Sequence, residues 1–331
     1  MHSPLETFPS SIWILTDGKA GDVAQCVGVA QALDCPYETR QVAPRAPFSW
    51  WLPFGPTDPG EWETRPGSPI APPYPDIAIA SGRRAAAYLR RIKRLSGGDT
   101  FTVFLKDPRT GPDAADLIWV PEHDKLRGRN VLVTPTSPHR FSASRLAELR
   151  GEKVPEIDRL AHPRVAVLVG GDSRHHKFTE DDQSRFLAGL RRMVREDGAK
   201  LLITASRRTP AGLAYSLSSL AKAGGHLYWT GAAPNPLGLY LAKADAIVAT
   251  ADSTNMIGEA TVTGKPVHVF KPSGGHDKIT RFLGNLEHLG VIHPFPGPLK
   301  TTTYEPIDAT PIIAERILTD FRAHRQRGRK P

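Results

Sequence analysis

The sequence predicts an α/β protein made of two Rossmann-like domains, each built on a parallel sheet. Apolar runs of strand length alternate with runs of helical periodicity, which is typical of parallel βαβ units. Two stretches, one from about residue 12 and one from about residue 163, each open with a strand, a glycine turn and a helix. The 331 residues are enough for two domains. We expect an N-terminal domain over 1–160, a C-terminal domain over 161–305, and, within 306–331, a helix at 308–323 that packs on the N-terminal domain and precedes a basic tail.

The first strand–turn–helix unit contains "WILTDGKAGD", residues 13–22. The strand is expected at 12–16 and the helix at about 22–33, so Gly18 and Gly21 fall in the turn between them. Free N–H groups and the positive end of a helix at such a turn favour a phosphate. The glycine spacing matches neither the dinucleotide fingerprint nor the P-loop. An ordinary βα turn that uses glycine for its dihedral angles is the alternative.

The alternation continues through the rest of the chain. A helix over 83–95 follows the strand at 76–80, and a helix after "GGDSRHHKF" is expected to begin at Thr179 or at Asp181 and Asp182. Further strands are expected at 37–43 and in "TFTVFLKDPR", "ADLIWVPEHD", "RNVLVT", "RVAVLV", "KLLITA", "HLYWTG", "AIVAT" and "PVHVF".

The composition points to an anionic partner. The formal net charge is +9 and the pI is about 9.6, which favours a nucleotide, a phosphorylated substrate, an acidic membrane surface or a nucleic acid. Two cysteines, Cys26 and Cys35, suit neither a disulfide framework nor a metal site. The sequence has no apolar run long enough to span a membrane and no secretory signal. We therefore expect a cytoplasmic protein, peripheral at the inner face of the membrane if it binds one.

The segment 44–75 is rich in Pro, Gly and Trp and is too long for an ordinary connection. Its cluster of Trp50, Trp51, Leu52 and Phe54 suggests a lid, an acceptor-binding surface or a patch that touches a membrane. The alternative is an ordered wrap over the core of its own domain, because aromatic clusters are commonly buried.

The helix over 83–95 is strongly basic. Its charges form either a solvated face or a docking surface for anionic lipid or a lipid-linked acceptor. Nucleic-acid binding is not favoured, because exposed aromatics do not alternate with these charges. The basic residues concerned are Arg83, Arg84, Arg90, Arg91, Lys93 and Arg94.

Four polar turns follow strands in the second half, and in a doubly wound sheet all four lie where ligands bind. A serine, threonine or asparagine at a helix start and the forked charge of arginine both suit a diphosphate, whereas Glu259 is placed to accept from ribose hydroxyls. Ordinary capping and turn roles are the alternative. The candidate binding residues in these turns are Gly171, Ser173, Arg174, Ser206, Arg207, Arg208, Ser253, Thr254, Asn255, Lys271 and His276.

The chain also resembles the mitochondrial fission ELM family over about residues 12–283. The runs that carry the resemblance include "WILTDGKAGDVAQCVGVAQAL", "IAIASGRRAAAYL", "FLKDPR", "VLVGGDSRHHKF", "TASRRTP" and "ADSTNMIGEATVTGKPVHVF". That family looks like the GT-B glycosyltransferases, with a ligand cleft between the two domains. The resemblance implies that Ser253, Thr254 and Asn255 meet a donor diphosphate, that Glu259 meets the ribose, and that the loop of Gly18 and Gly21 faces the cleft.

The expected function is therefore glycosyl transfer from a nucleotide sugar, without a metal site or a tightly bound cofactor. Asp22 or Asp17 is the candidate base that deprotonates the acceptor, although an aspartate is a weak base unless it is buried; the histidines at 175, 176 and 276 are alternatives. The competing interpretation is an adaptor that acts through a protein or a membrane, because the family's plant members are associated with recruiting a fission dynamin. An NAD-dependent epimerase is a third possibility, disfavoured by the absence of G-x-G-x-x-G.

Overall fold

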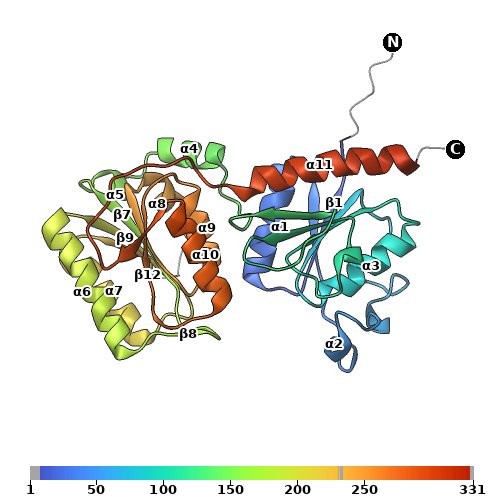
Figure 1. The fold of residues 1–331 in the computed structure, drawn as a ribbon, viewed down its shortest axis with the longest axis horizontal. Coiled ribbons are helices and arrows are strands. Elements are labelled where there is room, and N and C mark those ends of the chain that lie inside the picture. The colour runs from blue at the N-terminus through green and yellow to red at the C-terminus, as the bar shows by residue number, and fades with distance from the viewer. Residues whose placement is uncertain (1–7, 230, 232–233, 329–331) are drawn as a thin grey trace, which may run out of the picture. The chain divides into compact units, whose positions relative to one another are not determined.

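The computed structural model describes residues 8–229, 231 and 234–328, and these form two compact units. The first comprises residues up to 140 together with the chain from 309 onward, and the second comprises residues 141–308. Each unit is built on a six-stranded parallel sheet, so the predicted α/β class with two Rossmann-like domains is confirmed (Figure 1).

The sheet of the first unit has the strand order β2-β1-β3-β4-β5-β6. Four of its strands, β1, β3, β4 and β5, are buried along their whole length, as expected where helices cover both faces of a parallel sheet. The order reverses between β1 and β3, which is where open α/β sheets bind ligands. The strands are β1 (Ile12–Thr16), β2 (Tyr37–Gln41), β3 (Ile77–Ser81), β4 (Phe101–Leu105), β5 (Leu117–Pro121) and β6 (Val131–Thr134).

One face of this sheet is covered by α1 (Ala20–Ala32) and α11 (Ala309–Gly328), which pack against each other (Figure 1). The last helix of the chain thus returns to the first unit and buries the ring of Phe321 beside Phe101. The helix α3 (Ala85–Leu95) covers the opposite face with its apolar side.

The segment 44–75 is an ordered wrap that contains only α2 (Phe48–Trp51) and a 3₁₀ turn at Pro59–Glu61. Its anchor is Asp58, whose carboxylate is fully buried and accepts from the guanidinium of Arg45 at 2.8 Å. Those hydrogen bonds hold the pKa of Asp58 well below its usual range.

The predicted basic face of α3 is largely occupied by the same wrap. Arg91 forms a bidentate ion pair with Glu63, and Arg90 donates to the carbonyl of Pro53. Lys93 pairs with Asp116 on another side. Arg83 also donates to the wrap, at the carbonyl of Ser49. Four of the six cations therefore have structural partners, which fasten the wrap or a neighbouring loop to this helix and its start.

The sheet of the second unit has the strand order β10-β9-β7-β11-β12-β14, and the order reverses between β7 and β11. A small antiparallel pair, β8 (His176–Lys177) and β13 (Ser273–Gly274), lies apart from it. The strands of the sheet are β7 (Arg164–Val169), β9 (Lys200–Ala205), β10 (Leu227–Trp229), β11 (Ala246–Thr250), β12 (Val267–Phe270) and β14 (Ile292–Phe295).

Two helices, α6 and α7, cover one face of the second sheet, and the other helices of this unit cover the opposite face. The expected start of α6 is confirmed, since Thr179 is the N-cap and forms a reciprocal capping box with Asp182. The helices are α4 (Ala143–Gly151), α5 (Pro155–Asp158), α6 (Glu180–Asp197), α7 (Ala211–Gly224), α8 (Leu237–Lys243), α9 (Thr254–Thr261) and α10 (Asp277–His288).

The boundary between the units differs from the one expected near residue 160. Residues 141–160 pack on the second unit, where Leu146, Leu149 and Ile157 share a core with Leu241 of α8. The expected boundary was set by the start of the second strand–turn–helix unit, whereas the apolar side chains that precede this unit are buried by α8.

Both cysteines are buried and unbridged. Burial raises the pKa of the Cys26 thiol, which makes it a packing residue rather than a reactive one. Within the described part of the chain, every helix is too short or too polar to cross a bilayer.

Candidate functional site

The carboxyl edge of the second sheet is held together by Asp252, which follows β11. Its side chain is fully buried and accepts hydrogen bonds from the hydroxyl of Thr250 at 2.6 Å, the amide of Gly171 at 3.0 Å and the guanidinium of Arg208 at 3.0 Å. Thr250 is the last residue of β11, whereas Gly171 and Arg208 come from the loops after β7 and β9. One carboxylate therefore fixes three of the four turns that the sequence singled out.

The two glycines after β7 allow this approach. A Cβ on Gly170 would lie 2.2 Å from a carboxylate oxygen of Asp252, and a Cβ on Gly171 would lie 1.9 Å from the carbonyl oxygen of Arg208. The loops after β7, β9 and β11 pack so closely that no side chain fits at either position.

The neighbouring arginines Arg207 and Arg208 have different roles. Arg208 donates to the carbonyl of Asp172 at 2.9 Å and to that of Gly171 at 3.3 Å, besides its ion pair with Asp252. Its guanidinium thus stabilises the loops. The guanidinium of Arg207 forms no hydrogen bond or ion pair with any residue that the structure describes, and its side chain lines a pocket. Arg207 remains the candidate for binding an anion.

Two predicted serines are occupied by local turns. The hydroxyl of Ser206 donates to the carbonyl of Gly170 at 2.9 Å, and that of Ser173 accepts from the amide of His176 at 3.1 Å. Arg174 is exposed beside Ser173. Ser206 also lines the pocket beside Arg207. Ser173 instead orders the turn that leads to β8.

The residues at the start of α9 lie at the carboxyl end of β11, as the strand–turn–helix pattern predicts. Ser253 is the N-cap, and its hydroxyl accepts from the amide of Met256 at 3.4 Å. Thr254 and Asn255 form the first turn, and Glu259 lies one turn further along the helix; all three are half-buried. The N-terminus of an eight-residue helix is thereby aimed at the edge where the three loops meet.

The candidate residues in the loop after β12 contact α10 and not Asp252. The ammonium of Lys271 pairs with Glu287 of α10 at 2.9 Å, and the ring of His276 caps α10 by accepting from the amide of Lys278 at 3.1 Å. The rings of His276 and His175 lie 4.4 Å apart across the pair of short strands. Lys271 and His276 therefore have structural partners that their sequence positions did not indicate.

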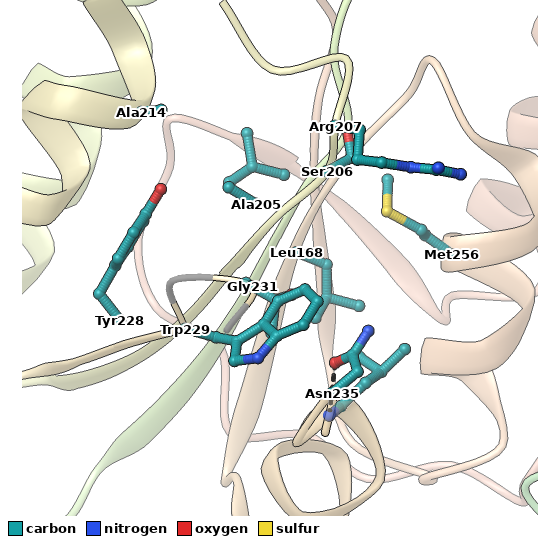
Figure 2. Close-up of a pocket in the computed structure, with 13 residues that line it drawn as sticks. Leu168, Ala205, Ser206, Arg207, Ala214, Tyr228, Trp229, Gly231, Asn235 and Met256 are labelled. Carbon is teal, nitrogen blue, oxygen red and sulfur yellow. Dashed lines mark hydrogen bonds between the residues drawn. The ribbon is translucent and has the colours of Figure 1, made fainter. Parts of the chain in front are cut away.

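A pocket of about 530 Å³ opens at the carboxyl ends of β7, β9 and β10. Figure 2 shows the ring of Trp229 projecting into it, with the side-chain amide of Asn235 toward one end and the guanidinium of Arg207 toward the other. Tyr228 and Met256 complete the wall. Burial raises the pKa of the Tyr228 phenol, so this group stays protonated and neutral.

The pocket suits a flat, partly polar ring joined to an anion. Indole, phenol and thioether groups offer faces for stacking, and the Asn235 amide, whose oxygen accepts from the amide of Leu237, leaves its NH₂ directed away from that bond. Trp229, Asn235 and Met256 are the residues that sequence reasoning missed. The signal that could have found them is an aromatic pair at the carboxyl end of an edge strand, followed by a polar turn.

The predicted catalytic residues lie in the first unit. Asp17 follows β1, and its buried side chain pairs with Lys19 at 2.9 Å. Asp22 lies in the first turn of α1 and pairs with Lys106 at 2.5 Å. Gly18 has a φ of 85°, the left-handed conformation that a glycine turn requires, whereas Gly21 lies inside the first turn of α1 in an ordinary helical position.

Within the residues that the structure describes, no group of three or more His, Cys, Asp or Glu side chains is arranged to hold a metal ion.

Comparison with known proteins places this geometry in context. The family model described as mitochondrial fission ELM1 matches residues 20–321. The chain is 28% identical to mitochondrial fission protein ELM1 of Arabidopsis thaliana over 276 residues, which is 75% of this chain but only 64% of the plant protein.

Among solved structures, the UDP-GlcNAc 2-epimerase of Methanocaldococcus jannaschii is similar over 93% of this chain and 99% of its own, with a TM-score of 0.56 and 11% identity. The same enzyme in complex with UDP-GlcNAc and UDP gives a TM-score of 0.53 at 10% identity, over 93% and 99% of the two chains. At these identities the likeness is one of fold, and the fold is a GT-B-like pair of Rossmann-like domains.

Proposed function

The chain belongs to the mitochondrial fission ELM1 family, and from that premise we propose that its second unit binds a nucleoside diphosphate and its sugar ester. The observation that carries the proposal is the pocket of Trp229, Asn235 and Arg207 at the carboxyl edge of the sheet. It combines a stacking face, an amide and an arginine without a described partner at the position where doubly wound sheets bind nucleotides.

In this proposal the base stacks on Trp229 and is read by the amide of Asn235. The diphosphate extends toward Arg207 and the first turn of α9, where Ser253 and Thr254 offer hydroxyl and amide donors. Glu259 accepts from the ribose. The fold relative named above was solved with UDP-GlcNAc and UDP, which supports uracil as the base to test first.

The reaction that these groups support is glycosyl transfer. A hydroxyl of the acceptor attacks the anomeric carbon, a new C–O bond forms, and the bond from that carbon to the diphosphate breaks. The nucleoside diphosphate leaves with the electron pair, and Arg207 and the N-terminus of α9 stabilise its charge. The acceptor proton goes to a carboxylate, for which Asp22 and Asp17 are the candidates.

Calorimetry of the full chain against UDP, GDP, CMP, ADP and NAD(P) tests the binding step. We expect saturable binding of one nucleoside diphosphate, with UDP the strongest. A folded, monodisperse protein that binds none of these nucleotides contradicts the proposal. If UDP binds, release of UDP from UDP-sugars in the presence of candidate acceptors then distinguishes transfer from 2-epimerisation, which converts the sugar without releasing UDP.

A second candidate role, attachment to an anionic membrane surface, is favoured by the tip of the wrap in the first unit. Trp50, Trp51 and Phe54 are exposed by 72%, 52% and 74%, although large aromatics are usually buried. Arg83 lies beside this tip, because its guanidinium donates to the carbonyl of Ser49 at 3.1 Å. We propose that these aromatics enter the interface of a bilayer that contains acidic lipid. The alternative is that these exposed aromatics contact a protein partner instead of a bilayer.

A further inference from the structure

A second pocket, of about 320 Å³, lies in the first unit and is separate from the nucleotide site proposed above. It opens at the carboxyl ends of β1, β3 and β4, where the strand order reverses. The residues of its wall that carry the argument are Lys19, Asp22, Gly82, Arg83, Lys106 and Arg109.

The wall of this pocket carries an excess of positive charge. Lys106 is neutralised by Asp22 and Lys19 by the adjacent Asp17, at 2.5 Å and 2.9 Å. The guanidinium of Arg109 forms no hydrogen bond or ion pair with the described residues, and that of Arg83 has the carbonyl of Ser49 as its acceptor. The wall also contains Asp107, whose carboxylate accepts from the backbone amide of Arg109 at 2.8 Å. One positive charge therefore remains in excess, and neither arginine forms an ion pair with the described residues.

The turn that presents two of these cations is strained. Lys106 has a φ of 83° and Arg109 a φ of 64°, both in the left-handed region that favours glycine. Each such residue is held in a conformation that its side chain disfavours. Among the described residues, the only other non-glycine with a positive φ is Asp34. Strain of this kind gathers at binding sites, because a required side chain is kept there in spite of its backbone.

Two helices begin at the edge of this pocket without a side-chain cap. The N-cap of α1 is Lys19 and that of α3 is Arg84, and neither side chain accepts from the first turn of its helix. Cations are unfavourable at the positive end of a helix. In the second unit, α6 and α9 have the ordinary caps Thr179 and Ser253. A bound anion would supply the acceptors that α1 and α3 lack.

A buried acceptor without a described partner lies against the pocket. The side chain of Asp17 is 5% exposed, and its Oδ1 receives no hydrogen bond from the residues that the structure describes. That oxygen lies 3.1 Å from the place where a Cβ on Gly82, a residue of the wall, would stand. A buried acceptor left unpaired destabilises the protein, so Asp17 fits a ligand that offers a hydroxyl.

From these observations we infer that the pocket of the first unit binds a phosphate ester that also carries a free hydroxyl. The phosphate contacts Arg83, Arg109 and the amides at the starts of α1 and α3, and the hydroxyl donates to Asp17. A volume of about 320 Å³ accommodates a phosphate with a small polyol or a sugar. The inference does not depend on nucleotide binding in the second unit.

Calorimetric titration of the full chain with glycerol 1-phosphate tests the phosphate contacts. We expect Arg83→Gln and Arg109→Gln each to weaken binding about tenfold, as the loss of a charged hydrogen bond does. Arg94→Gln is the matched control, because Arg94 is exposed on α3 outside the pocket. Arg207→Gln reports on the second unit and should leave this affinity unchanged. Equal affinity in the Arg83, Arg109 and Arg94 variants, or no binding to the wild type, overturns the inference.

The hydroxyl contact is tested by comparing two ligands. Asp17→Asn should weaken binding of glycerol 1-phosphate while leaving that of inorganic phosphate unchanged; equal losses for both ligands contradict the role of Asp17. Sedimentation with phosphatidylcholine vesicles that contain phosphatidylglycerol, whose headgroup is a phosphate ester with free hydroxyls, then distinguishes the sources of the phosphate. Sedimentation that is lost in Arg109→Gln assigns a lipid headgroup, and binding restricted to the soluble ester assigns a free metabolite.

Discussion

The guanidinium of Arg208 lies 3.0 Å from Oδ2 of Asp252, and this ion pair joins the loop after β9 to the loop after β11. Asp252 is completely buried, and its second oxygen accepts from Thr250. The pair thus fixes the positions of the loops beside the proposed nucleotide site relative to one another.

Asp252→Asn is expected to lower the free energy of unfolding by about 2 kcal/mol, because the half-exposed guanidinium of Arg208 and the amide of Gly171 lose a charged acceptor that is fully buried. Urea denaturation measures the change. The matched control is Asp197→Asn, at the exposed end of α6, where the loss should stay within about 0.5 kcal/mol. Equal stability of the two variants would show that Asp252 does not hold the loops together.

The two adjacent arginines should separate binding from stability. Arg207→Gln is expected to weaken UDP binding about tenfold and leave stability unchanged, since its guanidinium has no described partner. Arg208→Gln should instead destabilise the protein, because three acceptors lose their donor. Calorimetry and urea denaturation of both variants check this. The reverse pattern would assign the phosphate contact to Arg208.

Trp229 is expected to supply the stacking face for the base. Trp229→Ala should weaken UDP binding about tenfold or more, and Trp229→Phe should restore most of the affinity, because stacking requires a flat ring rather than an indole. Tyr215→Ala is the control: Tyr215 is 76% exposed on α7 and lies outside the pocket. Unchanged affinity in Trp229→Ala would exclude this wall as the base site.

The fold followed from local patterns in the sequence. The strands at Ile12–Thr16 and Ile77–Ser81 and the helix that begins after Thr179 lie where periodicity and capping residues placed them. These features depend on neighbouring residues along the chain. The unit boundary was missed because it depends on α4 packing against α8, a contact across about 90 residues that no local pattern records.

The site was predictable only in outline. The sequence placed the polar turns at the carboxyl edge, but it could not say which side chains have protein partners. Arg208 and Lys271 look as available as Arg207 until the structure pairs them with Asp252 and Glu287. Trp229 was treated only as a strand residue. The assignments of ligand contacts and of Asp22 or Asp17 as the base remain predictions.

Acid should destabilise the second unit through His268. Burial, His293 and Lys300 lower the pKa of this fully buried ring from 6.5 to about 4. The folded state holds the ring neutral. The contribution of this ring to the free energy of unfolding is therefore fully present above pH 6.5 and is lost as the pH falls toward about 4. The decrease in the free energy of unfolding approaches about 3 kcal/mol once the pH reaches the pKa of the folded state.

His268→Gln should remove that part of the pH dependence, since the amide oxygen of glutamine can accept from the amide of Lys300 as the ring does and does not titrate. Urea denaturation between about pH 7 and about pH 5 measures the difference. His288→Gln, at the exposed end of α10, should keep the dependence of the wild type. A parallel pH response in all three proteins would mean that His268 is not the titrating group.

The exposed tip of the wrap provides the last prediction. Phe54→Ser and Trp50→Ser should each reduce sedimentation with vesicles of phosphatidylcholine and phosphatidylglycerol several-fold, because an aromatic that enters the bilayer interface contributes through burial of its ring. Stability should not change, since both side chains are more than 70% exposed. Leu289→Ser is the control, because Leu289 is 53% exposed but belongs to the second unit. Equal sedimentation of the tip variants and the control would contradict membrane contact through the tip. If high salt removes binding while the tip variants do not, the membrane contact belongs to the arginines.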